Sequence, residues 1–150
     1  DGQGSYSSVI NDITNGPIRH LSDIDDDGDL DFIRTHAGFG NSFRVQYNEG
    51  NGRFRATSPV VTPTGPLNFR AAADFNDDGR EDYIMSIGSK TQLFYREAGL
   101  SGWEMLDLHP AASRCVTLGD LDGDGDTDIL IGFTTNQVNW IRNDGNLTFH

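Results

Sequence analysis

The chain carries three copies of an acidic nine-residue segment, at residues 23–31, 74–82 and 120–128. Each copy has oxygen-bearing side chains at its first, third, fifth and ninth positions and a glycine at its sixth. Calcium takes six to eight oxygen ligands at about 2.3–2.6 Å, and alternate residues of a tight loop can turn carboxylates onto one centre. Because the three copies share one register, they favour calcium-binding loops over solvated acidic turns.

The position within each loop predicts the role of the residue. Side chains at positions 1, 3, 5 and 9 are expected to bind the ion, and position 7 is expected to bind through its backbone carbonyl. Glycine at position 6 permits the positive φ that folds the loop back. The predicted metal-site residues are Asp23, Asp25, Asp27, Asp29, Asp31, Asp74, Asn76, Asp78, Arg80, Asp82, Asp120, Asp122, Asp124, Asp126 and Asp128. Zn²⁺ prefers nitrogen and thiolate donors and Mg²⁺ demands a near-ideal octahedron, so the predicted cofactor is Ca²⁺ at three sites.

The second loop differs from the other two. Asn76 replaces a carboxylate, and Arg80 stands where the backbone carbonyl is expected to bind. The carbonyl remains available, but the site has one formal charge fewer and a cation on its rim. This loop is predicted to bind calcium most weakly.

Apolar residues follow each loop at once, as in Phe32-Ile33 and Ile129-Leu130-Ile131. β-Branched and aromatic residues in such a run predict a strand. An EF-hand loop instead runs twelve residues, ends in a bidentate Glu and lies between two helices. Each acidic loop is therefore predicted to join two strands of a hairpin, and an EF-hand is excluded.

The loops begin at Asp23, Asp74 and Asp120, so they are spaced by 51 and 46 residues. Repeats of this length with four short strands each are typical of a β-propeller. The sequence thus predicts an all-β fold of three four-stranded antiparallel repeats, which are β-propeller blades with calcium hairpin loops. Residues 1–150 are predicted to form one repeat domain, with blade-like units at about 11–61, 62–108 and 109–150, and with residues 1–10 as an outer strand of a preceding or neighbouring blade.

The formal net charge of −12 belongs to the loops, which hold 16 of the 23 acidic residues. This acidity does not indicate a basic partner, and nucleic-acid binding has no electrostatic support. No segment approaches the 18 apolar residues of a membrane span. The chain starts with Asp1 rather than Met and shows no apolar leader, so it is expected to be a mature or excised piece.

Cys115 is the only cysteine, so no internal disulfide can form. Its place in an apolar segment predicts a buried, inert thiol. Extracellular modules bind calcium near 10⁻⁴–10⁻³ M. An extracellular protein, secreted or on the cell surface and held by calcium rather than by disulfides, is the predicted setting.

The chain resembles the FG-GAP/VCBS-type repeat family, whose members include the integrin α-subunit propeller. The resemblance rests on the three Asp-x-Asp/Asn-x-Asp-Gly-x-x-Asp loops and on the turns at 48–54 and 143–146. It implies one Ca²⁺ per blade on one face of a propeller, usually of seven blades, in secreted or cell-surface proteins. The Gly-Ala-Pro ending of the second strand is missing at 35–37, 86–88 and 132–134, which favours a lectin-like branch of the family over the integrin branch.

Aromatic residues offer a second kind of site. Tyr47, Tyr95 and Trp140 are interpreted as equivalent third-strand residues, which could form a sugar-stacking platform or pack between blades. The four histidines fall in no metal-binding spacing. No nucleophile–base set or phosphate-binding loop is found, so the protein is predicted not to be an enzyme.

These features predict a calcium-stabilised extracellular β-propeller segment that serves adhesion or acts as a structural scaffold. One alternative is a carbohydrate-binding lectin, and another is a subunit of an extracellular filament assembled head to tail. An accessory domain of a secreted enzyme is a further possibility. The turn at residues 1–6 recurs at 144–149, so the ends are expected to pair with a longer chain or with neighbouring copies. The predicted partners are calcium and a glycan or protein ligand.

Overall fold

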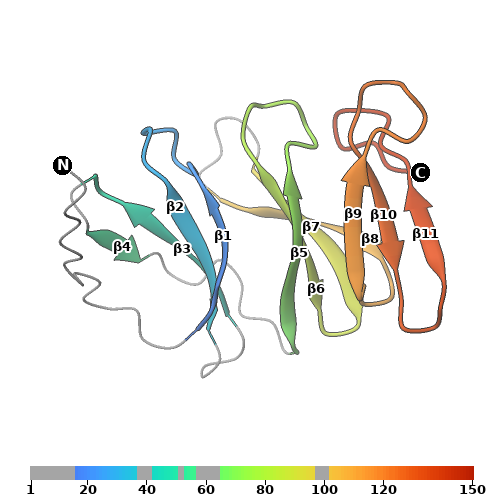
Figure 1. Ribbon diagram of the computed structural model, residues 1–150, viewed down its shortest axis with the longest axis horizontal. Coiled ribbons are helices and arrows are strands. Elements are labelled where there is room, and N and C mark those ends of the chain that lie inside the picture. Colours follow the sequence, from blue (N-terminus) through green and yellow to red (C-terminus); the bar gives the residue numbers. More distant parts are fainter. Residues whose placement is uncertain (1–15, 37–41, 51–52, 57–64, 97–101) are drawn as a thin grey trace, which may run out of the picture. The chain divides into compact units, whose positions relative to one another are not determined.

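The computed structural model describes residues 16–36, 42–50, 53–56, 65–96 and 102–150. Within these ranges the chain forms eleven β-strands and no helix, which confirms the predicted all-β fold (Figure 1). The predicted outer strand within residues 1–10 lies outside the described residues. The chain divides into two compact units, Asp1–Val61 and Thr62–His150.

The first unit contains one four-stranded antiparallel sheet whose strands pair in chain order. Its strands are β1 (Ile18–Ser22), β2 (Asp31–His36), β3 (Ser42–Asn48) and β4 (Phe54–Ala56). Phe32, Ile33 and Val45 of the two central strands are almost fully buried. The ring of Phe32 packs on that of Phe54 at a centroid distance of 4.9 Å, which ties β2 to the outer strand.

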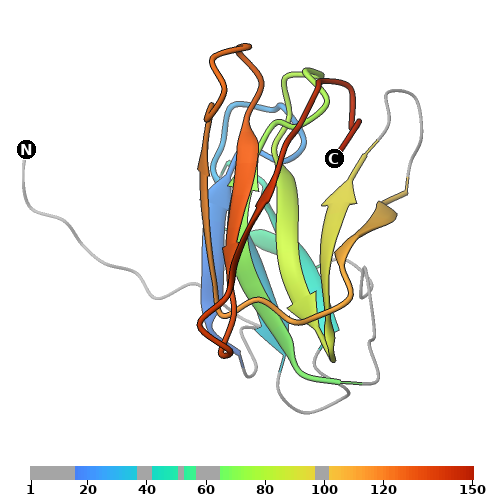
Figure 2. The same cartoon turned by 90° about the vertical axis from the view of Figure 1, so that its right-hand side faces the viewer.

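The second unit contains two antiparallel sheets, which lie side by side in Figures 1 and 2. The second sheet of the chain comprises β5 (Leu67–Ala73), β6 (Asp82–Ile87), β7 (Lys90–Tyr95) and β8 (Glu104–His109). The third sheet comprises β9 (Cys115–Gly119), β10 (Asp128–Gly132) and β11 (Val138–Ile141).

The third sheet has three strands, so the prediction of four strands in every repeat is wrong for this one. A single bridge between Asn143 and Phe149 stands in place of the fourth strand, with two backbone hydrogen bonds between Arg142 and His150. Positive φ angles at Asn146 and Leu147 turn the chain just before this bridge.

A shared apolar core joins the second and third sheets. Ile84 and Leu93 project from the second sheet, and Ile129 and Ile131 project from the third, and all four are fully buried. Burying each such side chain stabilises the fold by about 1.5–3 kcal/mol. The two sheets therefore pack face to face, as adjacent propeller blades do.

Strand pairing corrects the alignment of the aromatic residues. Ile84 pairs with Leu93 in the second sheet, whereas Leu130 pairs with Trp140 in the third. Trp140 therefore corresponds to Leu93, two residues before Tyr95. Val45 pairs with Ile33 in the first sheet, so Tyr47 and Tyr95 are equivalent as predicted, whereas the prediction that Trp140 is equivalent to them is wrong. The turn between β10 and β11 spans residues 133–137, against 88–89 between β6 and β7, so counting from the loops misaligned the third strand.

Cys115 is exposed, so the predicted burial of its thiol is wrong. It pairs with Gly132 on the face of the third sheet that points away from the shared core, opposite to the neighbouring Val116. Its strand is apolar because alternate residues pack on the second sheet, and that pattern does not bury the residues in between.

A buried hydrogen-bond network holds the connection between the second and third sheets. The hydroxyl of Thr91 donates to the carbonyl of Ala111 and accepts from the backbone N–H of Ser113, both at 2.8 Å. The hydroxyl of Ser86 lies 2.7 Å from the hydroxyl of Ser113, and it also accepts from Arg70 Nε at 2.9 Å. The network fixes residues 111–113 to the edge of the core and so positions the third sheet.

Replacing Thr91 by valine should lower the free energy of unfolding by about 1–3 kcal/mol, because the buried N–H of Ser113 loses its acceptor. Valine keeps the shape and the strand propensity of threonine. Thr117→Val on the exposed face of β9 is the matched control and should stay within about 0.5 kcal/mol. Urea unfolding in calcium measures both variants, and equal losses would contradict the role of the network.

Candidate metal centres

Each acidic loop joins the first two strands of its sheet. Residues 23–30 lie between β1 and β2, 74–81 between β5 and β6, and 120–127 between β9 and β10. The glycine at position 6 has a φ of 92° in the first loop, 83° in the second and 99° in the third. Residues with side chains rarely adopt these angles. The predicted turn of the loop is therefore present in all three copies.

The three loops share one hydrogen-bond pattern. The N–H of the position 6 glycine donates to the position 1 aspartate at 2.9, 2.8 and 3.1 Å in the three loops. The N–H at position 7 donates to the position 5 aspartate at 2.9 Å in each. These bonds hold the carboxylates at positions 1 and 5 toward the inside of the turn.

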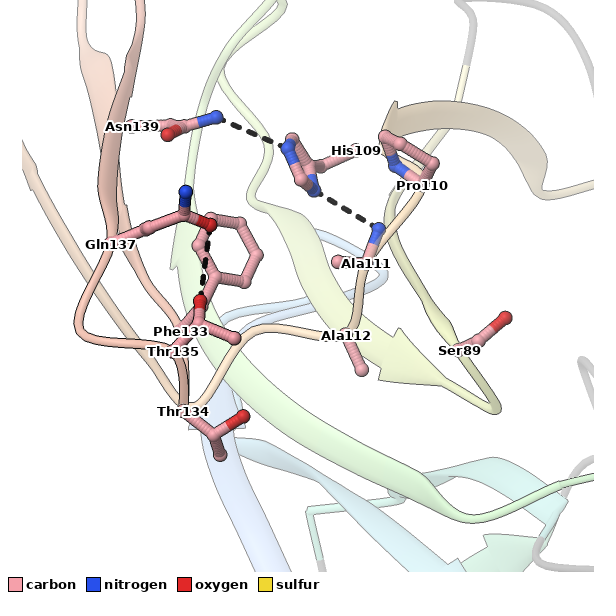
Figure 3. A pocket seen from close by; sticks show the side chains of 10 residues that line it. All are labelled: Ser89, His109, Pro110, Ala111, Ala112, Phe133, Thr134, Thr135, Gln137 and Asn139. Carbon is pink, nitrogen blue, oxygen red and sulfur yellow. Dashed lines mark hydrogen bonds between the residues drawn. The ribbon is translucent and has the colours of Figure 1, made fainter.

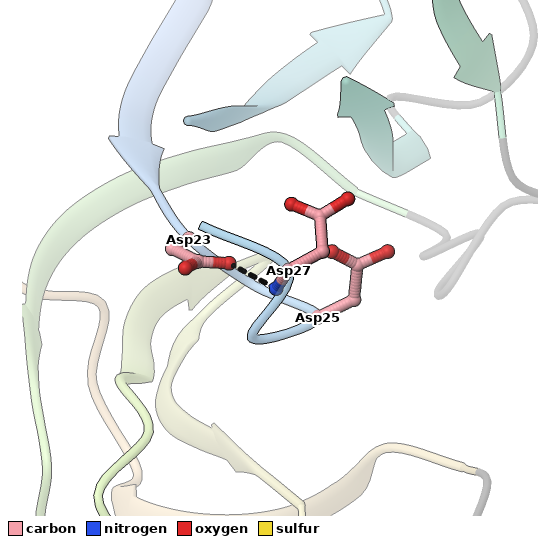
Figure 4. A group of neighbouring side chains, drawn as sticks. All are labelled: Asp23, Asp25 and Asp27. Carbon is pink, nitrogen blue, oxygen red and sulfur yellow. Dashed lines mark hydrogen bonds between the residues drawn. The ribbon is translucent and has the colours of Figure 1, made fainter. Parts of the chain in front are cut away.

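The carboxylates at positions 1, 3 and 5 meet in two of the loops. Asp23, Asp25 and Asp27 each place a carboxylate oxygen within 4.8 Å of the others, and Figure 4 shows the three side chains around one turn. In the third loop, Asp120, Asp122 and Asp124 form the same kind of group. Among the described residues, these are the two groups of three His, Cys, Asp or Glu side chains that could hold an ion.

The second loop forms no group of three acids because Asn76 occupies position 3. The side-chain oxygen of Asn76 accepts from the N–H of Asp78 at 3.2 Å, so it points into the same turn. Arg80 donates to the other carboxylate oxygen of Asp78 at 2.7 Å. A cation must compete with this guanidinium for Asp78, which is a structural reason for weaker binding in the second loop.

The aspartates at position 9 lie beneath the loops rather than in the groups of three. Asp31, Asp82 and Asp128 are at most 1 % exposed. One oxygen of each accepts from the N–H at position 2, at 2.9–3.0 Å. The other oxygen of Asp31 accepts from the N–H of Asn48, the last residue of β3, and that of Asp128 accepts from the N–H of Asn143, two residues after β11. Each buried carboxylate thus joins the loop to the third strand, while its remaining lone pairs can face an ion.

The position 7 aspartates of the first and third loops lie against the turn at the end of the third strand. A carboxylate oxygen of Asp29 lies 2.7 Å from the position that a Cβ atom on Gly50 would occupy. A carboxylate oxygen of Asp126 lies 3.1 Å from the position that a Cβ atom on Gly145 would occupy. Both glycines have positive φ, so only glycine fits this turn.

Asn48 and Asn143 belong to the site, although sequence reasoning noted them only as part of a family turn. Their N–H groups donate to the buried position 9 aspartates, at 2.7 and 2.8 Å. Their side-chain amides donate to the carbonyl at position 8, Leu30 and Thr127 respectively, at 3.3 Å. The Asn-x-Gly pattern shared by 48–50 and 143–145 was the signal for this brace.

The loops are electrostatically strained without a cation. Burial and the neighbouring carboxylates Asp31, Asp27 and Asp23 raise the pKa of Asp25. Burial, Asp124 and Asp128 likewise raise the pKa of Asp122. A raised carboxyl pKa means that the ionised form is disfavoured. A bound divalent cation would remove this penalty, and the all-oxygen donor set fits calcium.

Burial raises the pKa of Asp82 to about 7, and the nearby charges of Asp78 and Asp74 act in the same direction. Hydrogen bonds from the N–H groups of Phe75 and Arg96 offset part of this rise. Burial also acts on Asp78, but hydrogen bonds from Arg80 outweigh it and leave the pKa of Asp78 below its ordinary value. In the second loop, Asp82 therefore retains its proton up to about pH 7, and Asp78 is already paired with the guanidinium group of Arg80.

The fold and the loops together define an all-β repeat protein whose sheets carry acidic hairpin loops. Residues 23–85 match the family model of the FG-GAP-like repeat, which confirms the resemblance found in the loops. No curated protein matches the chain in sequence. Repeats of this family are typical of extracellular β-propeller-type modules. Among the described residues, no helix has the length and the apolar character needed to cross a membrane.

The raised pKa of Asp82 predicts how the calcium-free protein responds to pH. Between about pH 4 and pH 7 the folded state holds a proton that the unfolded state has lost, so the free energy of unfolding should fall as the pH rises. Urea unfolding in EDTA at both ends of this range measures the decline. Asp82→Asn should flatten it, whereas Asp77→Asn, an exposed residue of the same loop, should not. An unchanged slope in Asp82→Asn would contradict the assignment.

Proposed function

We propose that this protein is a calcium-stabilised extracellular module of the β-propeller type that serves adhesion or acts as a structural scaffold. The observation that carries the proposal is the grouping of three carboxylates in the first and third loops. The hydrogen bonds and glycine angles common to all three loops support a site in the second as well.

Calcium would be bound by the side chains at positions 1, 3, 5 and 9 and by the backbone carbonyl at position 7. All of these donors are oxygens, as calcium requires. The ion would supply positive charge at the point where each hairpin turns, and it would thereby hold the first two strands of the sheet together. The buried aspartate and the asparagine at the end of the third strand would transmit this restraint to the rest of the sheet.

The scaffold or adhesion role is favoured because the acidic residues with perturbed pKa values gather at the turns of the sheets, where an ion would stabilise the fold. We keep the sequence-based prediction that the module is not an enzyme. Each sheet is suited to presenting a surface to other macromolecules, and the partner would be set by surface residues rather than by the fold.

Removing calcium should lower the stability strongly. Binding to the folded state alone contributes about 2.7 kcal/mol per site when calcium is a hundredfold above the dissociation constant. Three sites would then rival a whole-domain stability of about 5–15 kcal/mol. Thermal melting with calcium and with EDTA measures this difference, and an unchanged midpoint would contradict the proposal.

Calorimetric titration with calcium compares one variant in a predicted ligand with one matched control variant. Asp122→Asn should abolish or weaken one binding event, because Asp122 belongs to the group of three in the third loop. Asp26→Asn should leave calcium uptake unchanged, because Asp26 is an exposed acid of the first loop outside the predicted ligand positions.

A lectin is the second candidate function, and a pocket in the second unit favours it. The pocket has a volume of about 470 Å³ and lies between the connection from β8 to β9 and the hairpin from β10 to β11 (Figure 3). That volume is typical of small-molecule sites, which combine apolar and aromatic walls with a few polar groups. The side chains of Phe133, Gln137 and Asn139 provide such a mixture.

Hydrogen bonds organise one wall of the pocket. Nδ1 of His109 accepts from the N–H of Ala111 at 3.0 Å, and its Nε2 lies 3.1 Å from the side-chain nitrogen of Asn139. The ring also packs on Phe133 at a centroid distance of 4.5 Å. A sugar could be recognised by the amides and hydroxyls that line this wall.

If the pocket binds a sugar, Gln137→Ala should weaken binding on a glycan array by roughly twofold to tenfold, the equivalent of one hydrogen bond of about 0.5–1.5 kcal/mol. Gln137 is exposed, so its loss should leave the melting midpoint unchanged. Thr148→Ala, on an exposed residue outside the pocket, is the control. Failure of the wild-type protein to bind any glycan would remove this candidate.

A further inference from the structure

The second acidic loop carries much less charge at its ligand positions than the first and third loops do. At positions 1, 3, 5, 7 and 9 the first and third loops each have five aspartates, for a formal charge of −5. The second loop has three aspartates at these positions, with Asn76 at position 3 and Arg80 at position 7, for a formal charge of −2. Because like charges repel, the second loop has less repulsion to relieve when no ion is bound.

Arg80 supplies a positive charge within the second loop. Its Nη2 donates to Oδ2 of Asp78 at 2.7 Å, and its backbone N–H donates to Oδ1 of the same carboxylate at 2.9 Å. The side chains of Arg80 and Asp78 are 24 % and 14 % exposed, so water and salt screen this ion pair less than a pair on the open surface. Arg80 therefore holds both oxygens of the position 5 carboxylate.

The arginine beside the third loop is engaged differently. Nε of Arg142 lies 2.6 Å from Asp144, which is outside the loop, and 4.0 Å from Asp122 at position 3. The side chain of Arg142 is also more exposed than that of Arg80. The close pairing of an arginine with a predicted ligand thus distinguishes the second loop from the third.

The amide that braces each turn comes from a different residue in the second sheet. In the first and third sheets it belongs to Asn48 and Asn143, which donate to the carbonyl at position 8. Arg96 is their equivalent, because its N–H also bonds to the buried position 9 aspartate. The guanidinium of Arg96 lies over the ring of Trp103, 5.0 Å from its centroid.

Asn76 provides an amide from the opposite side of the same turn. Its Nδ2 donates to the carbonyl of Arg96 at 3.3 Å, and its Oδ1 accepts from the N–H of Asp78 at 3.2 Å. An ionised aspartate at position 3 has no N–H to donate, so it could not make the first of these bonds. Asparagine at position 3 is therefore matched to arginine after the third strand, as aspartate is matched to asparagine in the other two repeats.

We propose that the second loop holds its turn without calcium, because Arg80 and Asn76 supply the charge and the cross-link that an ion would otherwise provide, and that this loop takes up calcium last. The inference rests on the proposed function and assigns a regulatory role to one of its three sites. The first and third loops, with their groups of three carboxylates, fill at lower calcium concentrations. The second fills when calcium displaces Arg80 from Asp78, so the protein responds to calcium in two steps.

Arg80 has opposite effects on the two states of the loop. It stabilises the calcium-free turn, because it neutralises Asp78, and it opposes the binding of an ion to the same carboxylate. A purely structural ion pair would instead contribute to stability with and without calcium. Opposite changes in calcium affinity and in calcium-free stability therefore identify the proposed role.

The experiment combines calorimetric titration with calcium and urea unfolding in EDTA. Wild type should show two tighter binding events and one weaker event, and Asp74→Asn should remove the weaker one, which assigns it to the second loop. Arg80→Gln should tighten the weaker event roughly tenfold, because a cation no longer competes for Asp78, and should lower the urea midpoint in EDTA. Arg114→Gln makes the same change in net charge at an exposed residue before β9 and should alter neither quantity.

The double variant Asn76→Asp/Arg96→Asn tests the amide independently of Arg80. It gives the second loop the residues that the first and third repeats have at these two positions. Its calcium affinity should rise, because position 3 gains a carboxylate while position 96 gains a bracing amide. Its urea midpoint in EDTA should fall, because the added charge is not neutralised in the absence of an ion.

The outcomes separate this inference from the proposed function. Equal affinity at all three sites of wild type would overturn the inference and leave the proposed function standing, as would an Arg80→Gln variant that behaves like Arg114→Gln. A weaker event that appears in Arg80→Gln but not in wild type would support the inference, since Arg80 then excludes the ion. A chain that takes up no calcium refutes the proposed function and this inference with it.

Discussion

Each sheet depends on the hydrogen bonds of one buried aspartate, which lies at the start of its second strand. Asp31, Asp82 and Asp128 are removed from water, and their carboxylates accept backbone N–H groups from the loop before them. For Asp31 and Asp128 the second oxygen accepts an N–H from the end of the third strand. The loop, the second strand and the end of the third strand thereby meet at one carboxylate, which fixes their positions relative to one another in the sheet.

This arrangement is also the physical basis of the proposed calcium sites. A buried carboxylate is costly unless it is neutralised or fully hydrogen-bonded, and several other carboxylates stand above it in the same turn. Neutralisation by a proton is one solution, and the pKa of about 7 at Asp82 shows that the second loop comes close to it. A calcium ion is the alternative that also neutralises the residues at positions 1, 3 and 5. The residues that determine the fold of the hairpin are therefore also the ones that would bind the proposed ion.

The fold class and the loops could be predicted from the sequence because both are local. A glycine at position 6 and oxygens at alternate positions produce the same turn wherever they occur, and the strands beside them follow from short apolar runs. The alignment of Trp140 could not be obtained in this way, since the length of the turn from β10 to β11 is set by residues outside the repeat pattern. The exposure of Cys115 was missed for a related reason, because a strand pattern shows which residues share a face but not whether another sheet covers that face. Asn48 and Asn143 were visible only as a repeated turn, and their role required the hydrogen bonds of the folded sheet.

The second strands show which sheets are built to be covered on both faces. A strand with one solvated face alternates apolar and polar residues, whereas a strand buried on both faces is apolar throughout. In β6 the run Tyr83-Ile84-Met85 is buried at every position, in agreement with this rule. In β10 the run Ile129-Leu130-Ile131 is equally apolar, yet the residues beside Leu130 on its face, Val138 and Trp140, are exposed. β10 therefore has the composition of a strand that is buried on both faces, although Val138 and Trp140 beside it are exposed in this chain.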